Sequence, residues 1–136
     1  MSPLAHRWIA VGAFLAAAGV ALGAYGAHGL SGLLAGWGYA GDDLTRRLAN
    51  YETAVRYQMF HALGLVLVGL ALQSRANFWW NASAWAMLLG IAIFCGLLYV
   101  LALAGPNLRW LGAVVPLGGL SLIVSWLLLA VGALKK

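Results

Sequence analysis

Long apolar runs, interrupted at a few points by ionisable side chains, dominate this chain. Asp, Glu, Lys and Arg are absent from four runs, and His61 is the one histidine within them: residues 8–27, 57–74, 76–108 and 110–134. A bilayer core of about 30 Å needs about 20 helical residues, and none of the runs alternates like a strand. The pattern therefore predicts four transmembrane helices, near residues 8–29, 54–73, 83–104 and 110–133.

Residues 30–52 form the one long connection, and its two halves differ. Its first half is a poor helix former because it is interrupted by glycines, at Gly29, Gly32, Gly36, Gly38 and Gly41. In the second half, Asp42 can cap a helix that starts at Asp43, and apolar residues recur at helical spacing: Leu44, Leu48 and Tyr51. We predict a short amphipathic helix that runs into the second span, where Glu52 and Arg56 can pair.

These elements predict the fold class: an all-α, polytopic membrane protein, with four transmembrane helices in a bundle and a short amphipathic helix in the first loop. One domain is expected over residues 1–136. The first apolar run is longer than the 7–15 residues typical of a signal peptide, so we expect it to stay as a span.

Composition supports a membrane location. Eight Lys or Arg and three Asp or Glu make 8% of the chain, against about 25% in an average soluble domain. So few charges cannot cover the large surface of a small soluble domain, which excludes that class. The net charge of +5 is scattered, so no nucleic-acid patch is expected, and the lipid bilayer is the expected partner. The single cysteine, Cys95, excludes an intrachain disulfide.

Four spans place both termini on one side of the membrane. That side, called end A, carries four cationic residues: Arg7, Arg75, Lys135 and Lys136. The other side, end B, carries Arg46, Arg47 and Arg109, with Arg56 at a span edge. Cytoplasmic loops hold the excess of Lys and Arg. The small excess at end A favours cytoplasmic termini in a bacterial inner membrane.

Two further patterns concern packing. The first span carries small residues on one helical face, and these form a candidate seam for close helix packing: Gly12, Ala16, Gly19, Gly23 and Gly26. The seam packs either on another span of the same chain or on a second copy. The fourth span contains a predicted helix break, because Pro116 lacks an N–H and clashes with the preceding turn; its residues are Gly112, Pro116, Gly118 and Gly119.

A helical rise of 1.5 Å per residue places most polar residues of the spans in the half near end B. This candidate polar intramembrane site comprises His28, Tyr57, Gln58, His61 and Tyr99. Polar side chains in a membrane usually face inward. His61 either makes an interhelical hydrogen bond, to Tyr99 or the Gly112 carbonyl, or binds a ligand, proton or metal. His28 either caps the first span or joins this site.

The candidate chemistry is limited. His28, His61 and Glu52 are too few for a zinc site, so no metal is expected. No Ser-His-Asp set, HExxH motif or phosphate loop occurs, and no acid lies within a span. We therefore predict no catalytic residues and no enzyme. A histidine-based proton route stays open, and so does a haem held between His28 and His61, although we expect no cofactor.

Four motifs in order resemble a known family. They are Gly23-Ala24-Tyr25-Gly26-Ala27-His28-Gly29, Tyr57-Gln58-Met59-Phe60-His61-Ala62, Phe94-Cys95-Gly96-Leu97-Leu98-Tyr99 and Pro116-Leu117-Gly118-Gly119. The chain resembles the bacterial inner-membrane family known as domain of unknown function 423, which includes YgdD-like proteins and is similar to the small animal transmembrane protein 256. The resemblance implies a four-helix inner-membrane protein with no established activity.

Three functional hypotheses follow. The first is a non-catalytic accessory, assembly or oligomerising protein, acting as a homo-oligomer or in a larger membrane complex. The second is small-molecule or proton binding or transport through the polar cluster around His61. The third is a haem-binding membrane protein.

Overall fold

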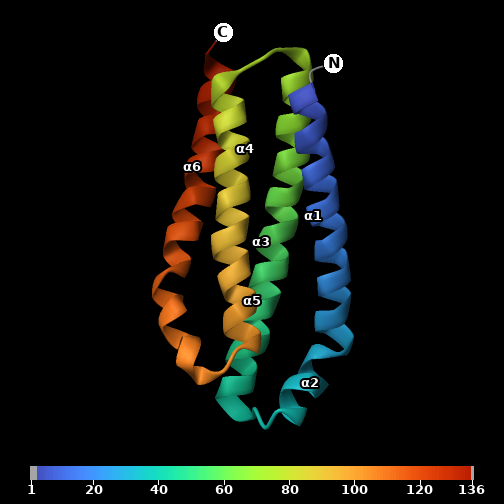
Figure 1. The fold of residues 1–136 in the computed structure, drawn as a ribbon, viewed down its shortest axis with the longest axis vertical. Helices are drawn as coiled ribbons and strands as arrows, with labels where there is room; N and C mark the ends of the chain where they lie inside the picture. Colours follow the sequence, from blue (N-terminus) through green and yellow to red (C-terminus); the bar gives the residue numbers. More distant parts are fainter. Residues whose placement is uncertain (1–2, 136) are drawn as a thin grey trace.

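The computed structural model describes residues 3–135, all of whose regular elements are helical (Figure 1). They are α1 (Pro3–His28), α2 (Leu30–Gly36), α3 (Gly41–Ser74), α4 (Phe78–Gly90), the π-helical η1 (Ile91–Cys95), α5 (Gly96–Leu103), the 3-10 helical η2 (Pro106–Ala113) and α6 (Val115–Leu134). Four segments are long and apolar enough to cross a membrane: Pro3–His28, Gly41–Ser74, Phe78–Leu103 and Pro106–Leu134. The predicted all-helical class with four spans is confirmed.

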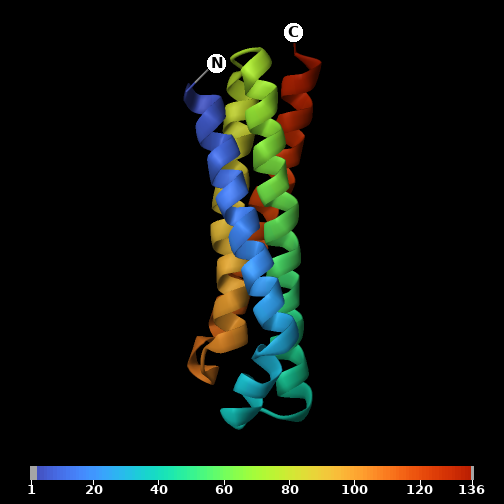
Figure 2. The same cartoon turned by 90° about the vertical axis from the view of Figure 1, so that its right-hand side faces the viewer.

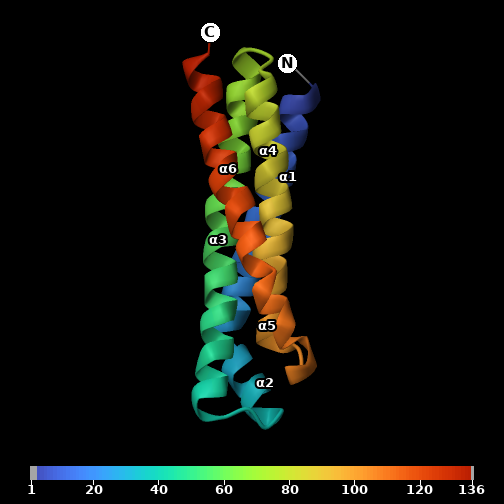
Figure 3. The ribbon, with the colours of Figure 1, turned by 90° about the vertical axis from the view of Figure 1, so that its left-hand side faces the viewer.

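The long helices form an elongated bundle in which α1 starts and α6 ends at the same end, end A (Figure 1). End B carries α2 and η2. Figure 2 shows α1 beside α3, and Figure 3 shows α6 beside α4. Helix α3 also packs on α4 and α5, so it connects the two pairs. Lys136, one of the four cations expected at end A, lies outside the described residues.

The first loop is more helical than its glycines predict. Residues 30–36 form α2, although this half was expected to be a poor helix. The physical reason is burial, because Leu30 and Leu34 are 1% and 0% exposed and pack in one cluster with Tyr51. Helix α3 begins at Gly41 with Ala40 as its N-cap, so the predicted Asp42 cap is wrong. The amphipathic helix does continue into the second span, and Arg56 bonds Glu52 at 2.7 Å.

The small-residue seam of α1 packs within the chain. A Cβ on Gly12 would lie 2.6 Å from the Ala62 carbonyl oxygen, and one on Gly26 would lie 2.8 Å from a ring carbon of Tyr51. Both neighbours belong to α3, so the two helices approach over these glycines. Within the chain, this face of α1 is therefore occupied by α3.

The fourth span contains a change of helix type in place of a kink. The 3-10 segment η2 ends at Ala113, and Pro116 lies in the first turn of α6. A discontinuity between two helix types thus falls within the predicted break. Its form differs from the expected kink, because Pro116 lies in the first turn of α6, where proline costs no helical hydrogen bond. Gly118 packs against η1, where an added Cβ would lie 2.4 Å from the backbone nitrogen of Phe94.

Candidate functional site

Gln58 joins three helices inside the bundle. Its Oε1 accepts a hydrogen bond from the Tyr99 hydroxyl of α5 at 2.9 Å, and its Nε2 donates to the Leu15 carbonyl of α1 at 2.9 Å. Gln58 is buried, with 4% of its surface exposed. A buried amide needs such partners because an unpaired polar group is costly in lipid. The two bonds therefore fix α1 and α5 against α3.

His61 has both ring nitrogens bonded. Its Nδ1 lies 2.7 Å from the Tyr57 carbonyl oxygen, and the indole Nε1 of Trp126 lies 3.1 Å from its Nε2. An indole can only donate, so Nε2 must accept and Nδ1 must carry the proton. The geometry thus favours a neutral imidazole of one tautomer. The expected partners, Tyr99 and the Gly112 carbonyl, are wrong.

His28 does not join the other four residues of the candidate site. It is exposed at the end of α1, whereas Gln58 and His61 are buried. His28 follows Gly26 by two residues, and Gly26 packs against Tyr51 of α3. His61 lies ten residues beyond Tyr51 on α3, which separates it from this level by roughly 15 Å at 1.5 Å per residue. Tyr57 does lie beside His61, with the rings stacked and their centroids 6.0 Å apart.

A lateral groove of about 570 Å³ lies beside His61, between α3, η1 and α6. It is lined by Tyr57, His61, Phe94, Pro116, Gly119, Leu120, Leu122, Ile123 and Trp126. Of the four residues of the predicted helix break, Pro116 and Gly119 line the groove. Gly118 is buried against Phe94, and Gly112 lines a different cavity, at end B. The groove walls are mostly apolar, and the one imidazole among them is already bonded.

Arg47 is a structural residue that sequence reasoning missed. It is 3% exposed, and its Nη1 donates to the carbonyl oxygens of Ala104 at 2.7 Å and Ala102 at 3.0 Å. These bonds satisfy carbonyls at the end of α5, where a helix leaves its last acceptors free. The signal was available, because position 47 falls on the apolar face of its helix, three residues after Leu44 and four before Tyr51.

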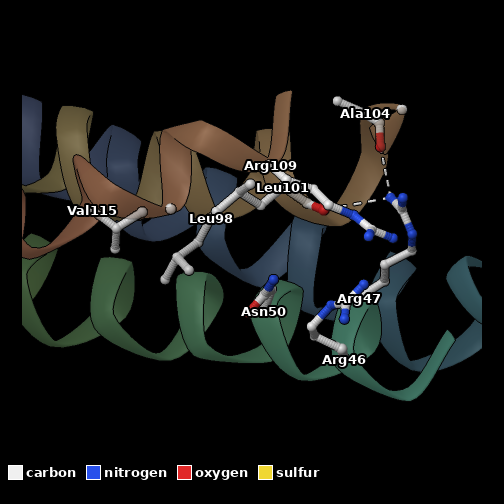
Figure 4. Close-up of a pocket in the computed structure, with 10 residues that line it drawn as sticks. Arg46, Arg47, Asn50, Leu98, Leu101, Ala104, Arg109 and Val115 are labelled. Carbon is white, nitrogen blue, oxygen red and sulfur yellow. Dashed lines mark hydrogen bonds between the residues drawn. The ribbon is translucent and has the colours of Figure 1, made fainter. Parts of the chain in front are cut away.

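A second cavity, of about 400 Å³, lies at end B between the start of α3 and η2 (Figure 4). Arg46, Arg47 and Arg109 line it. Asp43 bonds Arg46 and Arg47 and lies 3.5 Å from Arg109. Desolvation alone would raise the pKa of Asp43, but the Arg47 hydrogen bond and the positive charges of the arginines outweigh it and lower the pKa.

The described residues contain no group of three His, Cys, Asp or Glu side chains that could hold a metal ion. Cys95 is buried, 1% exposed, in an apolar cluster. Most polar side chains in the bundle core thus bond to other side chains or to backbone carbonyls, with the buried Trp80 Nε1 as an exception, whereas exposed guanidinium groups gather at end B.

Comparison with known proteins places the chain in a family. The profile described as "Protein of unknown function (DUF423)" matches residues 22–119, a range that contains the residues lining the cavity at end B and ends before Leu120, Leu122, Ile123 and Trp126 of the groove. The chain belongs to the DUF423 family. It is 38% identical over 128 residues to a UPF0382 membrane protein of Staphylococcus haemolyticus, covering 94% of this chain and 95% of that one.

Two further relatives agree. The UPF0382 membrane protein YwdK of Bacillus subtilis is 37% identical over 94% of this chain and 96% of its own length. The UPF0382 inner membrane protein YgdD of Escherichia coli is 37% identical over 85% of this chain and 80% of its own. No solved structure matches the chain. The chain has four apolar helices and its relatives are named membrane proteins of bacteria, so it is a bacterial membrane protein. None of the names of these relatives describes a reaction.

Proposed function

We propose that this protein is a non-catalytic accessory protein of the bacterial inner membrane that holds an apolar transmembrane helix of a partner chain. The observation that carries the proposal is the lateral groove between α3 and α6, about 570 Å³ in volume. Because the groove lies along the spans, beside His61, we expect it to lie within the bilayer. A partner in that position is a transmembrane helix, from a second copy or from a larger membrane complex.

The outer wall of α6 suits a helix partner. Pro116 and Gly119 line the groove without long side chains, next to the larger Leu120, Leu122, Ile123 and Trp126. Transmembrane helices associate by close packing over small residues, since lipid provides no hydrophobic drive between them. The groove therefore offers a surface on which a partner backbone can approach closely.

The hydrogen bonds of the polar residues in the bundle favour a role in helix association over a role in catalysis or ligand binding. His61 has both nitrogens bonded, and Gln58 bonds through both its oxygen and its nitrogen. A general base or ligand needs a free lone pair facing its substrate. These side chains instead connect helices of the same chain, which fits a protein whose interior is structural.

Cross-linking in native membranes, followed by native mass spectrometry of the extracted protein, tests this proposal. The informative variant is Ile123→Trp, which fills the groove from a side chain that is 60% exposed. Val20→Trp is the matched control, because Val20 is also β-branched, is 62% exposed and lies on α1, outside the groove.

The expected result is a discrete cross-linked complex whose yield falls several-fold in Ile123→Trp and is unchanged in Val20→Trp. A strictly monomeric protein without a co-purifying chain would contradict the proposal. Equal yields from the two variants would contradict the assignment of the partner to the groove.

A second candidate function is proton or small-molecule binding at the same place. It is favoured by one observation, that Tyr57 and His61 both line the groove. Proton uptake into proteoliposomes, followed with a pH-sensitive dye, tests the proton route. His61→Ala should abolish uptake while circular dichroism shows an intact fold. A variant with lower stability and unchanged uptake would count against this candidate.

The remaining hypotheses have their own tests. The bonded nitrogens of His61 and the distant His28 offer no paired ligands for haem, so we expect no Soret band from the purified protein. We also propose that both termini face the cytoplasm, as the Lys and Arg count favours. A fluorescent protein fused after the last residue should then fluoresce, and an alkaline phosphatase fusion there should be inactive.

A further inference from the structure

The cavity at end B is lined by two kinds of surface. Figure 4 shows the guanidinium groups of Arg46, Arg47 and Arg109 at one end of it, and Leu98 and Val115 at the other. Asn50 lies between these two ends (Figure 4). The cavity is therefore amphipathic along its length, with cationic groups near the membrane surface and apolar side chains deeper in the bundle.

The cationic end carries a surplus of positive charge. Three guanidinium groups line the cavity, and Asp43 is the one carboxylate paired with them. Glu52 does not reduce this surplus, because it pairs with Arg56. The third acid, Asp42, does not line the cavity. The three arginines and Asp43 therefore leave a net charge of about +2, which attracts an anion. Guanidinium is the side-chain group best matched to phosphate, which it binds through two parallel hydrogen bonds.

The three arginines differ in availability. Arg47 is buried and committed to the carbonyls at the end of α5. The side chains of Arg46 and Arg109 are 55% and 61% exposed and each faces the cavity. Arg47 thus holds the wall in place, and the other two have donors free to meet a ligand.

We propose that this cavity binds the phosphate group of an anionic membrane phospholipid, with Arg46 and Arg109 as its ligands. The apolar end, formed by Leu98, Leu101 and Val115, receives the start of the acyl chains. A volume of about 400 Å³ lies within the range of small-molecule sites. Basic pockets between transmembrane helices bind lipid headgroups on the cytoplasmic side of membranes. With cytoplasmic termini, as proposed above, end B faces the other side, so this lipid belongs to the outer leaflet. The proposal is independent of the partner groove, which lies deeper between α3 and α6.

The test compares lipids of identical acyl chains added to the detergent-solubilised full chain, with retained lipid counted by native mass spectrometry. The probes are phosphatidylglycerol, zwitterionic phosphatidylcholine and uncharged diacylglycerol. Inorganic phosphate is added in a separate arm as a competitor, to distinguish a lipid headgroup from free phosphate. The variant is the double substitution Arg46→Gln and Arg109→Gln.

Arg56→Gln is the matched control. Arg56 lies on the same helix near the same end, its side chain is 56% exposed, and it does not line the cavity. Arg46 and Arg109 are likewise exposed, so replacing them leaves the helix packing intact, and melting temperatures of all variants verify this. The double variant removes two charges and the control removes one, so Arg46→Gln and Arg109→Gln are also measured singly. Comparing each single variant with Arg56→Gln separates a site effect from a general loss of charge.

Phosphatidylglycerol should be retained in preference to the other two lipids. Each arginine near a membrane surface contributes about fivefold to the binding of an anionic lipid, so the double variant should bind roughly 30-fold more weakly. Arg56→Gln should bind as the native chain does. Equal retention of phosphatidylglycerol and diacylglycerol would overturn the proposal, as would an equal loss in the control. Displacement by inorganic phosphate at the lipid's own concentration would overturn the lipid assignment.

Discussion

Replacing Gly118 with alanine should destabilise the bundle far more than the same change at Gly96. A Cβ on Gly118 would lie 2.4 Å from the backbone nitrogen and 2.8 Å from the Cα of Phe94. Backbone atoms cannot rotate away, so α6 would have to move off the π-helical segment Ile91–Cys95. A Cβ on Gly96 would meet no atom within 4 Å.

The magnitude follows from two opposing terms. Overpacking a well-packed contact costs about 1–3 kcal/mol, and a clash with backbone belongs at the upper end. Alanine gains about 1 kcal/mol of helix propensity over glycine in water. That gain largely cancels in a membrane, because the spans stay helical in the unfolded reference state. We expect a loss of about 3 kcal/mol for Gly118→Ala and almost no change for Gly96→Ala.

The assay is reversible unfolding by SDS titration of the protein in mixed micelles, followed by tryptophan fluorescence. Circular dichroism on the same samples verifies that helix content is unchanged. Both glycines lie in the motifs on which the resemblance to the family was based, so motif membership alone would rank them equally. If the two variants unfold at the same SDS fraction, the close approach of α6 to Phe94 is not a determinant of stability and the reasoning is refuted.

Three further predictions use the same titration. His61→Ala leaves the Trp126 indole without its acceptor, so we expect a loss of about 1–3 kcal/mol; unchanged stability would show that this bond contributes nothing. Arg47→Met frees the carbonyls at the end of α5, and we expect a loss of about 3 kcal/mol, which a value near zero would contradict. The third prediction concerns pH. Because the pKa of Asp43 is lowered in the folded chain, its ionised carboxylate stabilises the fold at a pH above the ordinary aspartate pKa of about 4. That effect is lost as the pH falls through the lowered pKa. Asp43→Asn should flatten this dependence of the melting temperature, and Asp42→Asn, its control, should retain it.

The part of the candidate site that lies on one helix could be predicted from the sequence, because it depends only on the spacing of neighbouring residues. Tyr57, Gln58 and His61 share one helical stretch, and their grouping follows from helical period alone. Their partners did not follow. Trp126 lies 65 residues beyond His61 and Leu15 lies 43 residues before Gln58, and no pattern within a span says which face of another helix it meets.

Arg47 shows a different limit. The sequence places Arg47 on the apolar face of its helix, and a charged residue at such a position can be recognised as unusual. Its partners, however, are backbone carbonyls at the end of α5. Every residue has a backbone carbonyl, so the sequence does not reveal which carbonyls accept the bonds of Arg47. The same holds for the cavity at end B, which exists because η2 brings Arg109 back beside Arg46 and Arg47.

The sequence by itself determined the environment and the elements of this protein. So few charges and four long apolar runs require a membrane and four helices, since each span must satisfy its backbone internally. Tertiary structure alone decided that the small-residue face of α1 packs on α3, that His61 bonds Trp126, and that three arginines share one cavity. The physical reason is that lipid solvates every apolar face of a helix equally well. Hydrophobicity therefore places each helix in the bilayer, and shape and a few hydrogen bonds between distant residues select its neighbours.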